Sequence, residues 1–114
     1  METAEISRIA VDALEDIKGK DITVMDVRHL TSLFETMIIA TGDSNRQVRA
    51  LAENVRDKIK EAGGGILGIE GEKGSDWVLV DAGSLVVHVM HPTMRQYYNL
   101  EELWGATQRM RATG

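Results

Sequence analysis

Residues 77–90 read WVLVDAGSLVVHVM, and this stretch decides the fold because it predicts two strands joined by a tight turn. Apolar and β-branched residues, which favour extended backbone, fill both arms. A turn at Ala82 and Gly83 pairs Asp81 with Ser84 in the shortest kind of hairpin. The sequence therefore predicts two antiparallel strands, 77–82 and 85–90.

This register also pairs Trp77 with His88 and sorts the side chains onto two faces, because alternate residues of a strand point to opposite sides. One face is purely aliphatic, as a core requires, and holds Val78, Val80, Leu85, Val87 and Val89. The other is mixed, like the surfaces through which proteins bind one another, and holds Trp77, Leu79, Asp81, Val86, His88 and Met90. A three-residue turn would move Trp77 to the aliphatic face, so this interpretation depends on the turn.

Helical spacing of apolar residues appears on both sides of the hairpin. Thr3 is a candidate N-cap for the first helix, and Ser44 and Gln47 have the spacing of a capping box at the start of the second. The predicted helices are 3–18, a helix from Ser44 that Gly63 ends, and 92–104 with Pro92 at its start and a restart cap at Asn99.

Three further strands are predicted, at 22–27, 37–40 and 66–69. The continuous apolar run at 37–40 indicates a central strand that is buried on both faces. The order α-β-β-α-β-β-β-α predicts an α/β fold in which a mixed sheet packs against helices. We expect a single domain over 1–114, with an ordered core of about 3–104 and a frayed tail.

Composition narrows the class of protein. The 114 residues, 43% hydrophobic and 27% charged, suit one globular domain. The absence of cysteine excludes disulfides, thiolate zinc sites and cysteine nucleophiles. A net charge of −5 disfavours free nucleic acid as a ligand and favours a basic protein partner. Residues 1–16 resemble neither an export signal nor a membrane span, so we expect a cytoplasmic protein.

Three short motifs suggest chemistry, but each has a simpler explanation. His88 and His91 would point to opposite faces of a strand, and no other ligand completes a metal site. Residues 26–29 fit an ordinary turn. Residues 41–44, TGDS, join a strand to a helix whose free N–H groups could hold an anion, yet no Walker signature follows and capping explains the residues. We expect no enzyme, no metal and no cofactor.

Several stretches, taken in order, resemble the ribosomal silencing factor (iojap) family. Towards the C-terminus they are DWVLVD at 76–81, Gly83, VVHVM at 86–90, Arg95, Tyr97-Tyr98, Leu100-Glu101 and Leu103-Trp104. Upstream they are Asp26-Val27, IIATG at 38–42, Ser44, Arg46, Val48 and GIEG at 68–71. The resemblance extends from the first helix to Trp104, and the order and spacing of the pieces make it specific.

The resemblance implies a nucleotidyltransferase-like fold without catalytic carboxylates, in which binding replaces catalysis. It implies that the chain binds the large ribosomal subunit through the L14-type ribosomal protein and blocks joining of the small subunit when nutrients are scarce. It also implies a homodimer in the free state. The family's partner-binding surface then falls on Trp77, Leu79, Asp81, His88, Met90, Tyr97 and Tyr98.

Within that surface we expect Trp77 and Met90 to be apolar anchors and His88 to orient the rim. Asp81 and Glu101 would meet basic groups of the partner. Two positions depart from the family pattern: Ser84 stands where an acid is usual after the hairpin glycine, and Gln47 stands where histidine is common.

Two other readings remain open from the sequence. One is a degenerate nucleotidyltransferase or nucleotide binder that uses the junction from Gly42 to Ser44. The other is a dimeric scaffold module in which the Trp77 face joins two copies of the chain.

Overall fold

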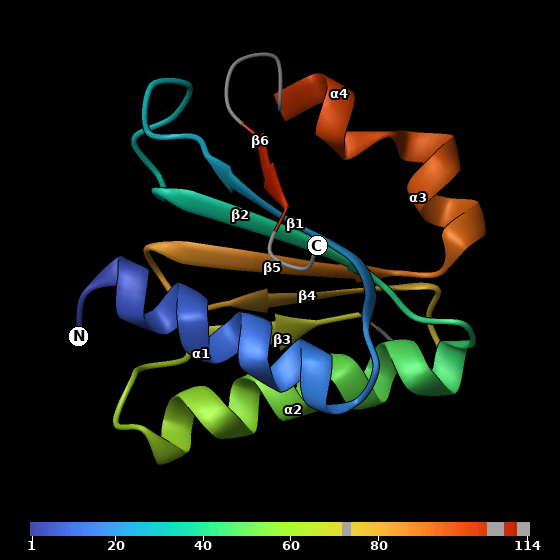
Figure 1. Cartoon of the computed structure of the whole chain (residues 1–114), viewed down its shortest axis with the longest axis horizontal. Helices are drawn as coiled ribbons and strands as arrows, with labels where there is room; N and C mark the ends of the chain where they lie inside the picture. The colour runs from blue at the N-terminus through green and yellow to red at the C-terminus, as the bar shows by residue number, and fades with distance from the viewer. Residues whose placement is uncertain (72–73, 105–108, 112–114) are drawn as a thin grey trace.

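The chain folds around a six-stranded mixed sheet with the order β3-β4-β5-β2-β1-β6, and helices cover both faces (Figure 1). The structure, a computed structural model, describes residues 1–71, 74–104 and 109–111, the last three as backbone only. The helices are α1 (Thr3–Asp16), α2 (Asn45–Glu61), α3 (Pro92–Tyr98) and α4 (Leu100–Trp104). The strands are β1 (Lys20–Asp26), β2 (Thr36–Thr41), β3 (Gly68–Glu70), β4 (Trp77–Asp81), β5 (Leu85–Met90) and β6 (Arg109–Arg111).

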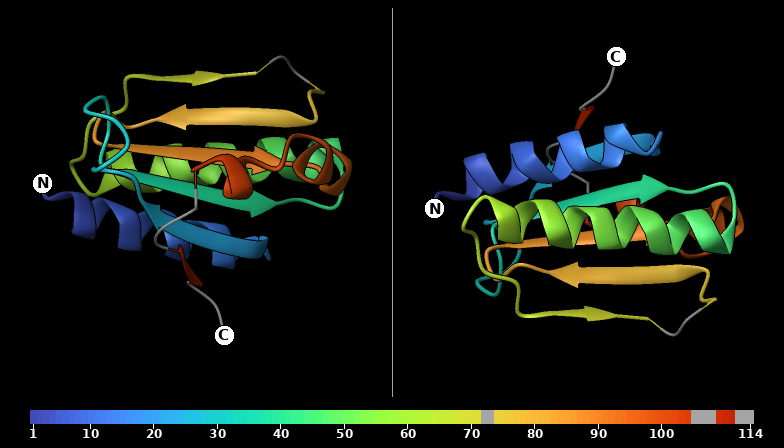
Figure 2. Two further views of the ribbon diagram at one scale, coloured as in Figure 1. Left: turned by 90° about the horizontal axis from the view of Figure 1, so that it is seen from above. Right: turned by 90° about the horizontal axis from the view of Figure 1, so that it is seen from below.

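The sheet is mixed because β2 and β5 are parallel while the other neighbours are antiparallel. Helices α1 and α2 lie side by side on one face, and α3 and α4 lie on the other (Figure 2). Strand β2, at the centre, is buried along almost its whole length. The predicted fold class and the central position of 37–40 are therefore confirmed.

The hairpin of β4 and β5 has the predicted faces but not the predicted register. Trp77 pairs with Met90, and Leu79 pairs with His88, so the pairing is shifted by two residues. The turn is Gly83-Ser84, because Gly83 has a φ of +85° and the tight hairpin turn with a single positive φ has it at the first position. A shift of two residues preserves the sides to which side chains point, so the predicted segregation of the faces is confirmed.

The aliphatic face of the hairpin forms the main core together with α1 and α2. All five of its predicted members are completely buried, namely Val78, Val80, Leu85, Val87 and Val89. Helix α2 contributes the predicted stripe of Val48, Leu51, Ala52, Val55 and Ile59. The hydrophobic effect on this face therefore holds the two long helices on the sheet.

The caps of the long helices differ in how well they were predicted. Ser44 Oγ accepts a hydrogen bond from the N–H of Gln47 at 3.1 Å, as a capping residue does. The Gln47 side chain reaches back one residue further than in a capping box and accepts from the N–H of Asp43 at 2.6 Å. The prediction of Thr3 as a cap was wrong, because Thr3 is already helical and Glu2 precedes it.

Two findings at the C-terminal end extend the prediction. Asn99 has a left-handed backbone that ends α3, and its side chain accepts from the N–H of Glu102 in α4, so the predicted restart is confirmed. Beyond Trp104 the sequence predicted only a frayed tail, whereas Arg109–Arg111 pairs with the open edge of β1. The expected fraying of residues 105–108 and 112–114 lies outside the described residues.

None of the helices in the described part of the chain has the length and apolarity that a membrane span needs.

Candidate functional site

Exposed tyrosines mark the layer formed by α3 and α4. Tyr97 is 79% exposed and Tyr98 is 49% exposed, although both side chains are large and largely apolar. Leu103 of α4 is exposed as well. Contiguous exposed apolar groups are uncommon on monomeric proteins and mark binding surfaces.

The tyrosines continue into a row of aromatic rings that crosses from α3 to the sheet. The ring centroids of Tyr97 and Tyr98 are 5.0 Å apart, and those of Tyr98 and Trp77 are also 5.0 Å apart. Trp77 is 5.7 Å from His88 and donates its indole N–H to His88 Nδ1 at 2.9 Å. We call Trp77, His88, Tyr97 and Tyr98 the aromatic row.

Each ring of the aromatic row packs against at least one neighbouring ring. Edge-to-face and tilted ring pairs at these separations are favourable. The Trp77 hydrogen bond also fixes the ring of His88, because Nδ1 must be the unprotonated, accepting nitrogen. A fixed aromatic surface loses little conformational entropy on binding, which is what an interface anchor requires.

Burial lowers the pKa of His88 from 6.5 to about 4. The unfolded chain binds this proton near pH 6.5 and the folded chain only near pH 4, so the unfolded state holds more protons between these values. We expect the free energy of unfolding to fall by about 2 kcal/mol as the pH drops through this window, allowing for the partial exposure of the ring. Urea unfolding of wild type and His88→Gln at pH 7 and pH 4.5 checks this.

The glutamine variant is the appropriate control because its amide can accept the Trp77 hydrogen bond but does not titrate. We expect its loss of stability over the same pH range to be smaller than that of wild type. An equal loss in both proteins would assign the pH dependence to the carboxylates alone.

Leu79 and Asp81 lie on the same side of β4 as Trp77, but at increasing distance along the strand. Leu79 is half-buried and pairs across the sheet with His88, beside the aromatic row. Asp81 is at the turn, where its Oδ1 accepts from the N–H of Gly83 at 2.9 Å. Asp81 therefore supports the hairpin turn with one of its carboxylate oxygens.

The structure corrects one predicted contact residue, Met90, and pairs another, Glu101, with an arginine. Met90 is 0% exposed and packs in a second apolar cluster between the sheet and the α3–α4 layer, so it cannot be a surface anchor. The side chain of Glu101 is 19% exposed and pairs with Arg95 at 2.7 Å in a partly buried position. The prediction for Met90 was wrong because α3 and α4 fold back over the mixed face of the sheet, whereas the contact role of Glu101 stays a prediction.

Residues 30–34 form an exposed apolar loop that sequence reasoning missed. Leu30 and Leu33 are exposed in this loop. The ring of Phe34 lies 5.8 Å from that of Trp104, which brings the loop beside α4. The signal in the sequence was three large apolar residues within a segment that is too long for a tight turn.

The pattern of the family described as "Ribosomal silencing factor during starvation" matches residues 1–114. The chain belongs to the ribosomal silencing factor family. It is 60% identical over 114 residues to a protein named ribosomal silencing factor RsfS in Chromobacterium violaceum, with 100% of this chain and 93% of that protein covered. The predicted resemblance is confirmed, and the family name describes a regulator of ribosomes.

Two further relatives support the family assignment. A crystal structure of a protein from Chromobacterium violaceum superposes with a TM-score of 0.90 at 60% identity, covering 100% of this chain and 95% of that chain. The chloroplastic protein Iojap of Zea mays is 39% identical over 93 residues, which cover 82% of this chain and 40% of that protein.

The junction between β2 and α2 is the alternative nucleotide site, and the packing of this chain explains why its residues are there. The N–H of Gly42 donates to the carbonyl of Met90 at 3.1 Å. A Cβ at Gly42 would lie 2.9 Å from the backbone nitrogen of Val48, so glycine is needed for close packing of strand and helix. Asp43 pairs with Lys20 at 2.8 Å. The residues of this junction therefore have structural roles.

The two histidines considered as metal ligands also have separate partners. His88 accepts from Trp77, while His91 Nδ1 accepts from the N–H of Thr93 and caps α3. Across the residues that the structure describes, no group of three or more histidine and carboxylate side chains is arranged to hold a metal.

Proposed function

We propose that this chain binds the large ribosomal subunit through the aromatic row and sterically prevents the small subunit from joining. The observation that carries the proposal is the exposure of Tyr97 and Tyr98 next to a half-buried Trp77. Clustered aromatic anchors of this kind supply most of the affinity of protein interfaces. In a family named for silencing ribosomes, such a surface supports docking and not catalysis, so the protein acts without being an enzyme.

The proposed partner is a basic protein of the subunit face, of the L14 type. The chain carries a net charge of −5, so attraction to a basic ribosomal protein would speed the encounter. Trp77, Tyr98 and Leu79 would be desolvated at the centre of the contact, and Asp81 would meet a cation at the rim. Asp81 also serves the hairpin turn, where it accepts from the N–H of Gly83.

The size of the chain explains how docking would silence the ribosome. The aromatic row lies on the face of α3 and α4, so α1 and α2 on the other face would project from the subunit (Figure 2). The chain measures 33 × 31 × 27 Å. A body of this size on the intersubunit face would keep the small subunit from reaching its contacts.

The family description names starvation, which supports a proposal about the setting. We propose that the protein acts in the cytoplasm when nutrients are limiting. In the free protein we expect two copies to pair through the same exposed apolar surface, because an exposed surface of this kind favours self-association. Dimerisation and ribosome binding would then compete.

Sedimentation of purified subunits tests the proposal. The chain is incubated with large subunits and centrifuged through sucrose, then small subunits are added and the joined fraction is scored. We expect co-sedimentation together with fewer joined ribosomes. Absence of co-sedimentation would overturn the proposal, and co-sedimentation with normal joining would overturn the steric mechanism.

A further inference from the structure

The α3–α4 layer, which presents the tyrosines, packs on the sheet through side chains that are only partly buried. All residues of both helices are described, and none is fully buried. Met94, Leu100 and Trp104 are only partly buried against the second apolar cluster. Helices of seven and five residues have too little intrinsic stability to keep their position alone.

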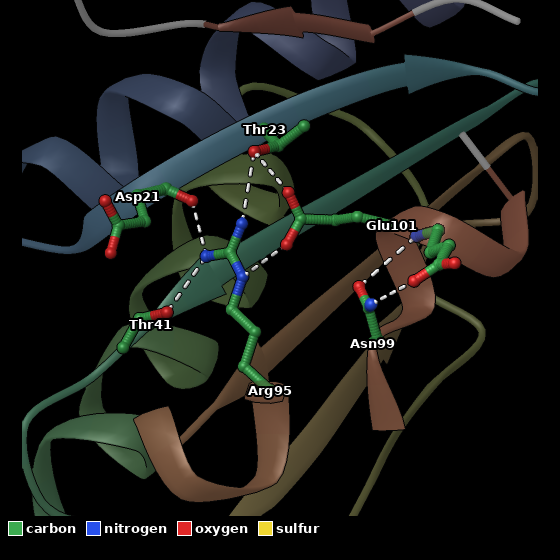
Figure 3. A network of polar contacts seen from close by, with 7 residues as sticks. Asp21, Thr23, Thr41, Arg95, Asn99 and Glu101 are labelled. Carbon is green, nitrogen blue, oxygen red and sulfur yellow. Dashed lines mark hydrogen bonds and ion pairs between the residues drawn. The ribbon is translucent and has the colours of Figure 1, made fainter. Parts of the chain in front are cut away.

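One arginine connects this layer to the sheet (Figure 3). Arg95 of α3 donates to Glu101 Oε1 of α4 at 2.7 Å and to the hydroxyl of Thr41 in β2 at 2.9 Å. It also donates to the hydroxyl of Thr23 at 3.1 Å and to the backbone carbonyl of Asp21, both in β1. The planar guanidinium thus joins four acceptors on three elements, which only its forked geometry allows.

The acceptors on the sheet are specialised for this arginine. Thr23 and Thr41 are the two buried polar residues that the described part of the chain contains. The Thr23 hydroxyl accepts from Arg95 and donates to the other oxygen of Glu101 at 3.3 Å. Both threonines therefore have their hydroxyls satisfied within the Arg95 network.

A distortion of β1 supplies the fourth acceptor. The pairing of β1 with β2 is irregular between Lys20 and Thr23, and Asp21 has a φ of +48°, a left-handed conformation that costs energy for a residue other than glycine. Irregularities of this kind re-aim groups out of the regular ladder. Here the Asp21 carbonyl is directed at Arg95 (Figure 3).

We propose that Arg95 is the positioning residue of the docking surface, because its guanidinium fixes α3 and α4 on β1 and β2 and so places Tyr97 and Tyr98 beside Trp77. Its side chain is only 13% exposed and lies among its partners inside the protein, so it acts through the tyrosines and not by touching the ribosome. The positioning role of Arg95 rests on the proposed function, because docking is the activity that the positioned tyrosines would serve.

The test compares Arg95→Gln with Arg49→Gln, an arginine-to-glutamine substitution in the α1–α2 layer. Arg49 of α2 also pairs with a carboxylate, Glu53 at 3.1 Å, and donates to a carbonyl, that of Gly71 at 2.9 Å. Arg49→Gln therefore matches the charge change and the type of bonds lost, far from α3 and α4. Amide hydrogen exchange and binding to purified large subunits are measured for both variants.

We expect Arg95→Gln to speed amide exchange of residues 92–104 by about tenfold or more while α1 and α2 exchange normally. Binding should weaken by about tenfold, mainly through a slower association rate, because fewer molecules hold the tyrosines in position. Arg49→Gln should change binding by less than about twofold. Arg95→Lys should fall between wild type and Arg95→Gln, because an ammonium cannot reach all four acceptors at once.

Thr41→Val provides a milder variant if Arg95→Gln does not fold. It removes one acceptor of Arg95 with almost no change of shape, and we expect a smaller change of exchange and binding in the same direction.

Three results would overturn the positioning role. The first is weaker binding of Arg95→Gln with normal exchange of 92–104, which would make Arg95 a direct contact. The second is no change of Arg95→Gln in either measurement. The third is an equal loss of binding in Arg95→Gln and Arg49→Gln. If wild type itself fails to bind large subunits, the proposed function falls, whereas the exchange measurement still decides whether Arg95 fixes α3 and α4.

Discussion

Trp77→Ala is expected to weaken binding to large ribosomal subunits by about 2 kcal/mol or more, roughly a 30-fold rise in Kd. Trp77 is the central ring of the aromatic row, with Tyr98 on one side and His88 on the other. Removing the indole takes away the largest apolar group of the proposed contact and also leaves His88 Nδ1 without its donor. Equilibrium binding to purified large subunits measures the change.

The variant must first be shown to be folded, because Trp77 also packs on the second apolar cluster. Far-UV circular dichroism and a cooperative unfolding curve provide this control. Trp77→Phe, which keeps an aromatic ring but loses the indole N–H, should retain most of the affinity. Undiminished affinity of a folded Trp77→Ala would remove the aromatic row from the docking surface.

Native mass spectrometry of the same variant separates docking from a scaffold role. If the Trp77 face only joined two copies, Trp77→Ala would become monomeric while ribosome binding stayed unaltered or absent. Loss of both dimer and ribosome binding would indicate that the two interactions share one surface.

Met90→Ala is expected to lower the free energy of unfolding by about 3 kcal/mol, because the methionine side chain is completely buried and its loss leaves a cavity. The affinity of the folded protein for large subunits should stay within about twofold of wild type, since Met90 does not reach the surface. Urea denaturation measures the first quantity, and binding well below the denaturation midpoint measures the second.

Met90→Leu is the matched control, because it keeps the volume and should cost less than about 1.5 kcal/mol. A stable Met90→Ala variant with a large loss of affinity would restore Met90 as a contact residue and would contradict its position in the second cluster.

The sequence predicted those parts of the fold that depend on local patterns. Helix α2 carries its apolar stripe and its cap within one segment, so both could be identified. The faces of the hairpin were correct because a two-residue shift leaves alternation unchanged. The predicted register was wrong because it depends on which residue begins the turn. The positive φ of Gly83 at the first turn position decides this, and the sequence alone is compatible with more than one turn.

The candidate site was predicted less completely, because it is assembled from distant segments. Trp77, Leu79 and His88 share a hairpin, so alternation placed them together. The burial of Met90 depends on α3 and α4 turning back over the sheet, which no local pattern reports. Likewise, Thr23 in β1 and Thr41 in β2, which accept hydrogen bonds from Arg95, are 72 and 54 residues away from it in the chain, so Arg95 was recognised only as part of a family motif.

The parallel pairing of β2 with β5 has a consequence for the order of assembly. The neighbours of β2 are β1, which precedes it directly, and β5, which is separated from it by α2, β3 and β4. During synthesis the inner edge of β2 therefore has no partner until residues 85–90 have been made. One edge of β2 therefore stays unpaired until most of the chain has been made, and pairings between distant segments form slowly. Helix α3 follows β5 directly in the chain, so a nascent chain acquires the aromatic row only after β2 can pair with β5.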